Sequence, residues 1–144
     1  MIKKAEQSSI ETAAELAFML WSENDIENLK NEFKELICRD TARIFIKYEG
    51  SAAVGFAQCQ LRYDYVEGTY TSPVGYLEGI FVKEEFRHKG YAGELLAECE
   101  KWAQSCGCKE FGSDCEIDNT GSLRFHEAMG FTEANRIICF IKKI

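Results

Sequence analysis

Proline and long apolar runs are scarce in this chain of 144 residues, which contains a single proline. Proline-rich tails and linkers need far more proline, and no low-complexity tract is present, so we expect one globular domain over residues 1–144. No apolar run approaches the roughly 20 residues of a membrane span, so no membrane association is expected. No apolar segment follows the basic residues Lys3 and Lys4, so we also expect no signal peptide and a cytoplasmic location.

Basic residues are the second deficit. Lysine and arginine number 17 against 24 acidic residues, which gives a formal net charge of -7. Neutralising the phosphates of a nucleic acid requires a basic face, so this balance argues against general nucleic-acid binding. An acidic protein attracts cations instead, and we therefore expect a cationic partner.

Histidine is also rare, with His88 and His126 as the only two, whereas cysteine is frequent, with seven residues. An odd number of cysteines without an export signal is typical of reduced thiols in a reducing compartment. Cys106 and Cys108 could form half of a metal site, but neither histidine has the spacing of a zinc ligand. We therefore expect ordinary thiols, no disulfide framework and no metal.

Periodicity predicts both helices and strands. Patterns repeating every two residues alternate with patterns repeating every 3.6 residues, which distinguish strands from amphipathic helices. The predicted order is a strand at 2–5, helices at 8–21 and 26–38, a hairpin of strands 43–48 and 53–63, a strand at 74–82, a helix from 91 to near 107, a strand at 110–115, a helix at 120–129 and a last strand at 136–141. This order predicts an α+β fold with a mostly antiparallel central sheet and helices on both faces.

A basic, glycine-bearing segment, Arg87–Gly93, opens the helix that follows the strand at 74–82. Glycines at a helix start let backbone amides approach an anion, and the helix dipole favours negative charge there. Such a loop can hold a pyrophosphate, although a solvated basic loop with a helix cap has the same pattern. With Arg87, Gly90 and Ala92 in the signature positions, the segment resembles the coenzyme A loop of the GNAT acetyltransferase superfamily.

A second segment supports that resemblance. It carries Asn119, Ser122, Phe125 and His126 before the pair Gly130-Phe131, in the order and at the distance of the second coenzyme A segment of the family. The resemblance extends over nearly the whole chain. It implies acetyl-coenzyme A as co-substrate and a sheet that splays open where this molecule lies.

The resemblance also assigns roles to residues near the coenzyme. It implies that amides around Ile80 polarise the thioester carbonyl, that Phe81 and Val82 pair with the pantetheine arm, and that a bulge near Gly79 opens the strand. The residues that this resemblance places at the coenzyme are Ile80, Phe81, Val82, Arg87, His88, Lys89, Gly90, Tyr91, Ala92, Gly93 and Asn119.

His126 marks a departure from the family. Many members have a tyrosine at this position, four residues before the glycine of the Gly-Phe pair, where it protonates the departing thiolate. An imidazolium could donate a proton to sulfur in the same way, since the unperturbed pKa of histidine is about 6.5. The alternative is a helix-surface histidine with no catalytic part, and the sequence leaves both open.

Longer strings narrow the resemblance. Arg62–Thr69 and Thr71–Val82, together with Trp21-Ser22 and Gly112–Asp114, are similar to the aminoglycoside 6′-N-acetyltransferases, specifically their Acinetobacter- and Salmonella-like branch. In that branch the residues corresponding to Trp21, Tyr65, Glu78 and Asp114 surround the aminoglycoside. The branch often carries an acid near the position of Asn135, where this chain has Glu133 nearby.

The chemistry of such a substrate agrees with these residues. An aminoglycoside carries several ammonium groups, which Glu78 and Asp114 can pair with, while Trp21 and Tyr65 offer aromatic faces. Glu78 stands out because it interrupts an apolar strand, where a buried unpaired charge is costly. Trp21 could equally serve the core, since it ends an amphipathic helix.

The expected reaction is direct transfer of an acetyl group from acetyl-coenzyme A to a primary amine, the 6′-amine of an aminoglycoside. Either Glu78 or Asp114, directly or through water, would take the proton that the ammonium must lose before it attacks. Acetylation of another cationic amine, such as a polyamine, a small metabolite or a peptide N-terminus, is the alternative within the enzyme class. A non-catalytic acyl-coenzyme A binding domain is the alternative outside it. The resemblance also implies a homodimer.

Overall fold

One five-stranded sheet organises the chain in a computed structural model that describes residues 1–144. The strand order is β1-β2-β3-β4-β5. Strands β1 (Ile2–Lys4), β2 (Ala42–Glu49), β3 (Ala52–Arg62) and β4 (Val74–Val82) pair antiparallel, and the short β5 (Phe111–Gly112) lies parallel to β4. The mostly antiparallel sheet that the sequence predicts is therefore confirmed.

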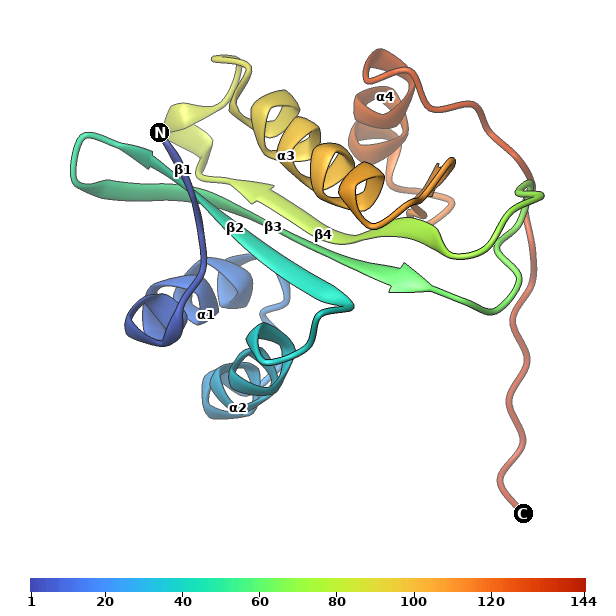
Figure 1. The fold of residues 1–144 in the computed structure, drawn as a ribbon, viewed down its shortest axis with the longest axis horizontal. Coiled ribbons are helices and arrows are strands. Elements are labelled where there is room, and N and C mark those ends of the chain that lie inside the picture. Colours follow the sequence, from blue (N-terminus) through green and yellow to red (C-terminus); the bar gives the residue numbers. More distant parts are fainter.

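Two pairs of helices cover the two faces of this sheet (Figure 1). Helices α1 (Ile10–Leu20) and α2 (Ile26–Ile37) lie on one face, and α3 (Tyr91–Ser105) and α4 (Thr120–Ala128) lie on the other. Short 3₁₀ turns at Gln7–Ser9 and Glu84–Phe86 lead toward α1 and α3. None of the helices combines the length and the apolar character that crossing a membrane requires.

Each face of the sheet has its own core, because side chains of a strand alternate between the two sides. On β3, Phe56 packs with Phe33 of α2, whereas Cys59 packs with Leu95 and Cys99 of α3. The first core holds α1 and α2 against β2 and β3. The second core holds α3 over β3 and β4, and so fixes the start of α3 beside the end of β4.

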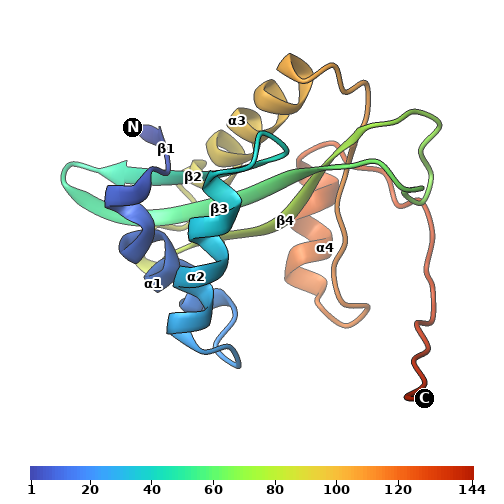
Figure 2. The same cartoon turned by 60° about the horizontal axis from the view of Figure 1, so that its bottom comes forward.

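The last predicted strand, 136–141, is wrong. After Phe131 the chain forms no helix or strand, its residues are exposed, and it runs away from the sheet (Figures 1 and 2). The strand predicted at 110–115 is only the two residues of β5. Extended segments need a neighbouring strand to hydrogen-bond with, and the tail has none in this chain.

Candidate active site

The sheet opens between β4 and β5. These strands pair only at Gly75 with Phe111 and at Tyr76 with Gly112, so the edge of β4 that faces away from β3 is unpaired from Leu77 onward. Unpaired backbone groups at such an edge can hydrogen-bond to an added extended chain. The splayed sheet expected from the sequence is therefore present, and Ile80, Phe81 and Val82 lie on its open edge.

A β-bulge lies at the same place. Gln58 pairs with Gly79 and Cys59 pairs with Leu77, which leaves Glu78 as an extra residue in β4. Leu77 and Ile80 both pack toward α3, so the two residues between them share the opposite face. The bulge predicted near Gly79 is thus found one residue earlier, at Glu78.

Trp21 covers this bulge from the loop after α1. A Cβ built on Gly79 would lie 2.4 Å from Cζ2 of Trp21, so the indole ring rests directly on the glycine. The ring also makes an edge-to-face contact with Phe56, with 5.8 Å between the ring centroids. Trp21 therefore packs at the edge of the core and borders the bulge, while its contact with the substrate stays a prediction.

Arg62 and Tyr76 connect the two predicted carboxylates. Nε and Nη2 of Arg62 donate hydrogen bonds to the Glu78 carboxylate at 3.0–3.1 Å. The guanidinium carbon of Arg62 lies 3.4 Å from the ring centroid of Tyr76. The hydroxyl of Tyr76 donates a hydrogen bond to Oδ2 of Asp114 at 2.5 Å. Glu78 and Asp114 thus belong to one continuous polar network.

Tyr76 has a raised pKa in this network. Burial raises the pKa of the Tyr76 phenol above its usual value, and the hydrogen bond to the Asp114 carboxylate raises that pKa further. Tyr76 therefore stays protonated and acts as a hydrogen-bond donor. The sequence analysis missed both Arg62 and Tyr76 as site residues, although both lie within the strings that carry the resemblance. An arginine at the end of the strand that pairs with β4 was the available signal.

The segment Arg87–Gly93 connects β4 to α3 with an open backbone. Nε of Arg87 donates to the carbonyl of Val82 at 3.0 Å, which ties the loop to the end of β4. His88 and Gly90 have positive φ angles of 62° and 81°, and Gly90 is the N-cap of α3. No atom lies within 4 Å of a Cβ built on Gly90, so the start of the helix is accessible. This geometry suits an anion held by backbone amides.

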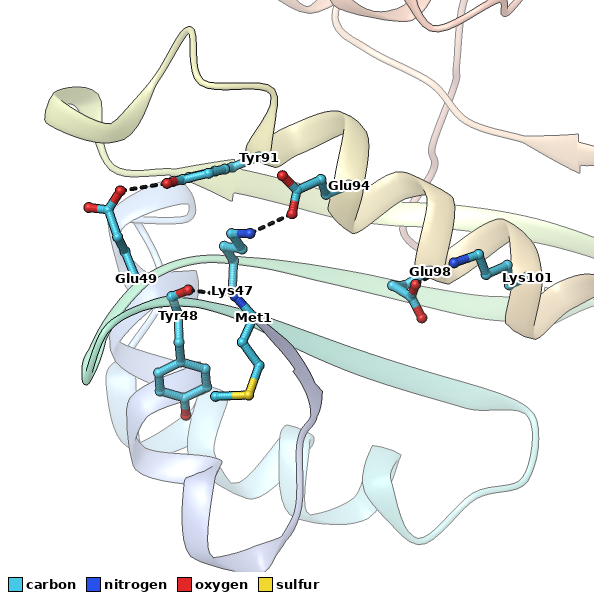
Figure 3. A network of polar contacts seen from close by, with 8 residues as sticks. All are labelled: Met1, Lys47, Tyr48, Glu49, Tyr91, Glu94, Glu98 and Lys101. Carbon is cyan, nitrogen blue, oxygen red and sulfur yellow. Dashed lines mark hydrogen bonds and ion pairs between the residues drawn. The ribbon is translucent and has the colours of Figure 1, made fainter.

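A polar network behind this loop anchors the start of α3 to β2 (Figure 3). Nζ of the buried Lys47 forms an ion pair with Glu94 and lies 4.3 Å from the ring centroid of Tyr91. Glu49 accepts hydrogen bonds from the Tyr91 hydroxyl and, at 3.1 Å, from Nζ of Lys89. The hydrogen bond from Tyr91, and to a smaller extent that from Lys89, lowers the pKa of the Glu49 carboxyl below its usual value.

His126 is half-buried rather than free on the surface of α4. Its Nδ1 lies 2.7 Å from the carbonyl oxygen of Ser122, which can only accept, so Nδ1 carries a proton. Its Nε2 lies 2.7 Å from the hydroxyl of Ser113, the residue before Asp114. Its ring also contacts Phe131 edge-to-face. His126 therefore bridges α4 to Ser113, the residue after β5, and its part in proton donation stays a prediction.

Two further predicted residues have different surroundings. Tyr65 is 75% exposed in the loop between β3 and β4, and its hydroxyl makes no hydrogen bond. The side-chain oxygen of Asn119 accepts from the amide of Ser122 and caps α4. Asn119 thus serves the helix with its oxygen and has only its amide nitrogen free. No cluster of three or more metal-ligating side chains gathers in the structure.

Comparison with known proteins agrees with this geometry. A family model described as the acetyltransferase (GNAT) family matches residues 10–131. The chain belongs to this family. Among curated GNAT relatives, an "Aminoglycoside N(6')-acetyltransferase type 1" of Acinetobacter haemolyticus is 37% identical over 143 residues, covering 99% of this chain and 98% of the relative. A protein of the same name from Salmonella enteritidis is 35% identical, covering 99% and 98%.

Solved GNAT structures are similarly close. The structure of AAC(6')-Iy in complex with the bisubstrate analog CoA-S-monomethyl-acetylneamine has a TM-score of 0.97 at 35% identity, covering 100% of this chain and 98% of the other. The apo structure of the aminoglycoside 6'-N-acetyltransferase AAC(6')-IG from Acinetobacter haemolyticus has a TM-score of 0.95 at 36% identity, covering 100% and 99%.

Proposed function

We propose that this chain transfers the acetyl group of acetyl-coenzyme A directly to the 6′-amine of an aminoglycoside. One observation carries the proposal. The open edge of β4 lies beside the polar network of Glu78, Arg62, Tyr76 and Asp114. Full-length relatives that carry this activity in their names, at 33–37% identity, support it. Acetyl-coenzyme A supplies the activated thioester, and the open edge and the accessible Gly90 amide fit its extended arm and its phosphates.

The residues of the chain have separate tasks in this proposal. The amides around Ile80 stabilise the developing charge on the thioester oxygen, and Phe81 and Val82 align the pantetheine arm. The amides of Arg87–Gly93 hold the pyrophosphate. These tasks place the thioester beside the bulge, on the side where Glu78 and Trp21 lie.

Proton transfer completes the reaction. The substrate amine has a pKa near 10, as lysine does, so it arrives as an ammonium and must lose a proton to Asp114 or Glu78, directly or through water. Its nitrogen then forms the new bond to the acetyl carbon while the bond from that carbon to sulfur breaks. The electron pair leaves with sulfur, and the new amide nitrogen loses its second proton. In this proposal His126 donates a proton through Nε2 to the thiolate, so that one proton is released overall.

Thiol release tests this function. The protein is mixed with acetyl-coenzyme A and with kanamycin, tobramycin, spermidine or short peptides, and free thiol is recorded. We expect release with the aminoglycosides, and no release with an aminoglycoside that carries a hydroxyl in place of the 6′-amine. Release only with spermidine or peptides would instead support another cationic amine. No release with any amine, despite bound coenzyme A, would support a non-catalytic binding domain.

We also propose that the protein is a homodimer in which the tail after Phe131 pairs with the second copy. Ile138, Phe140 and Ile141 are 81–89% exposed, and they lie on both sides of an extended chain, as in a strand buried on two faces. β5 has a free edge, and α4 has no fully buried residue. Nδ2 of Asn135 donates to Glu67 in the loop between β3 and β4, so the start of the tail contacts this loop.

The location of the protein is a separate proposal. Its seven cysteines are all free thiols, which supports a reducing, cytoplasmic location.

A further inference from the structure

A positive charge lies inside the pocket proposed for a cationic substrate. Arg62 is the last residue of β3 and projects to the face where Glu78 leaves the bulge of β4. Its side chain is 37% exposed and that of Glu78 is 19% exposed, so the ion pair is partly shielded from water. Arginine is charged at every accessible pH, so the free protein always carries this cation beside Glu78.

The contacts of Arg62 leave little of Glu78 free. Both oxygens of the Glu78 carboxylate accept from the guanidinium, in the two-pronged geometry that makes arginine–carboxylate pairs strong and directional. Stacking on the Tyr76 ring holds the guanidinium in the same orientation. The carboxylate has about four acceptor sites, and Arg62 fills three of them, two on Oε1 and one on Oε2. A substrate ammonium that approaches Glu78 therefore has to compete with the guanidinium.

The charges of the network determine how many ammonium groups it can hold. Glu78 and Asp114 contribute two negative charges, and Arg62 cancels one of them. Asp114 shares only Oδ2, with the Tyr76 hydroxyl, and its other oxygen accepts no hydrogen bond in the structure. An amine with a single ammonium can pair with Asp114 alone, whereas a polycation can also compete for Glu78.

We propose that Arg62 is a specificity-determining residue that competes with the substrate for Glu78. In the free protein its guanidinium occupies the cation position at Glu78, and the aminoglycoside displaces it on binding. This inference rests on the proposed aminoglycoside activity and adds to it a selection for polycations. Small monoamines lack the second charge needed to displace the guanidinium and are held only at Asp114.

Binding measurements test the competition directly. Tobramycin is titrated by calorimetry into the coenzyme A complex of the wild type, Arg62→Gln, Glu78→Gln and the double variant. We expect Arg62→Gln to lower the Kd for tobramycin roughly 3–10-fold, since a partly shielded ion pair no longer has to be broken. In the Glu78→Gln background the same substitution should change the Kd little, because the contested carboxylate is absent. Arg39→Gln, which removes an exposed arginine at the end of α2, is the matched control and should leave the Kd unchanged.

If Arg62 has only a structural role, the Kd for tobramycin should change in the opposite direction. If the guanidinium only holds Glu78 in place, Arg62→Gln will raise the Kd, and that result would overturn the inference.

A measurement on the wild type does not depend on whether a variant folds. The NMR signal of the Arg62 Nε–H should shift when tobramycin is added and stay in place with a monoamine sugar. An unmoved signal with tobramycin would also overturn it. Failure of the proposed function looks different, because wild-type protein would then release no thiol with any aminoglycoside; the titrations would use the amine that does react.

Discussion

Glu78 and Asp114 differ in how much of each carboxylate is available. Both oxygens of Glu78 accept from Arg62, whereas Asp114 accepts only from Tyr76. A base must have a free oxygen within reach of the proton that it takes. We therefore propose Asp114 as the base and Glu78 as the residue that holds a substrate ammonium.

Substitution of the two acids separates these roles. We expect Asp114→Asn to lower kcat about 100-fold or more, the usual effect of losing a general base. Glu78→Gln should mainly raise the KM for the amine. Neither should change the affinity for coenzyme A, measured by calorimetry, and Asp40→Asn, at an exposed acid between α2 and β2, serves as the control. Equal losses of kcat in both variants would contradict this division.

Whole elements, rather than single side chains, would form the anion site proposed at the start of α3. The Lys47–Glu94 ion pair and the contacts of Glu49 hold the first turn of α3 against β2, and Arg87 ties the preceding loop to β4. The start of α3 is therefore fixed from two sides before any ligand binds. A site made of backbone amides depends on such fixation, since no side chain has to adjust.

A substitution at Gly90 tests the role of the start of α3. A glutamate there would combine a residue disfavoured at a φ of 81° with a negative charge at the helix start, so Gly90→Glu should abolish coenzyme A binding in calorimetry. Gly107, at the other end of α3, has a φ of 87° and equally open surroundings. Gly107→Glu carries the same strain and charge and should keep coenzyme A binding. Unchanged affinity in Gly90→Glu would contradict the assignment of the loop.

At the scale of the whole molecule, the tail after Phe131 is the segment on which the proposed homodimer rests. Its apolar side chains point into water, and the free edge of β5 lacks a strand. If two copies exchanged their tails, each tail would bury its apolar side chains and would pair with the free edge of β5 in the other copy. The proposed pocket lies close to this edge, since Asp114 and the Ser113–His126 contact follow β5 directly.

Truncation after Asn135 tests the exchange. By light scattering after gel filtration, the wild type should have twice the 16.4 kDa of one chain, and the truncated variant should be a monomer. Met19→Asp, which replaces an apolar residue of α1 that is 53% exposed, should remain a dimer and controls for loss of surface hydrophobicity. A monomeric wild type, or a dimeric truncated variant, would contradict the proposal.

Much of this architecture could be predicted because its signals are local. Asp25 caps α2 and Asn119 caps α4 where the sequence places helix starts, and Gly90 stands where a left-handed residue precedes α3. Hydrophobic periodicity distinguished the helices from β2, β3 and β4 for the same reason. The family motifs could also be found, since the glycines and the basic residues of Arg87–Gly93 are adjacent in the chain.

What the sequence determined by itself was the acidic balance, which is a matter of composition. It also determined the order of the elements up to α4 and the family signature in Arg87–Gly93, which depend on neighbours in the chain. Only the tertiary structure decided that Glu78 is paired with Arg62, that Tyr76 connects this pair to Asp114 and that His126 meets Ser113. Only it decided that residues 136–141 find no strand to pair with. The physical reason is the same in each case: an ion pair, a shared hydrogen bond or a sheet edge depends on which distant segments meet, and sequence spacing carries no record of that.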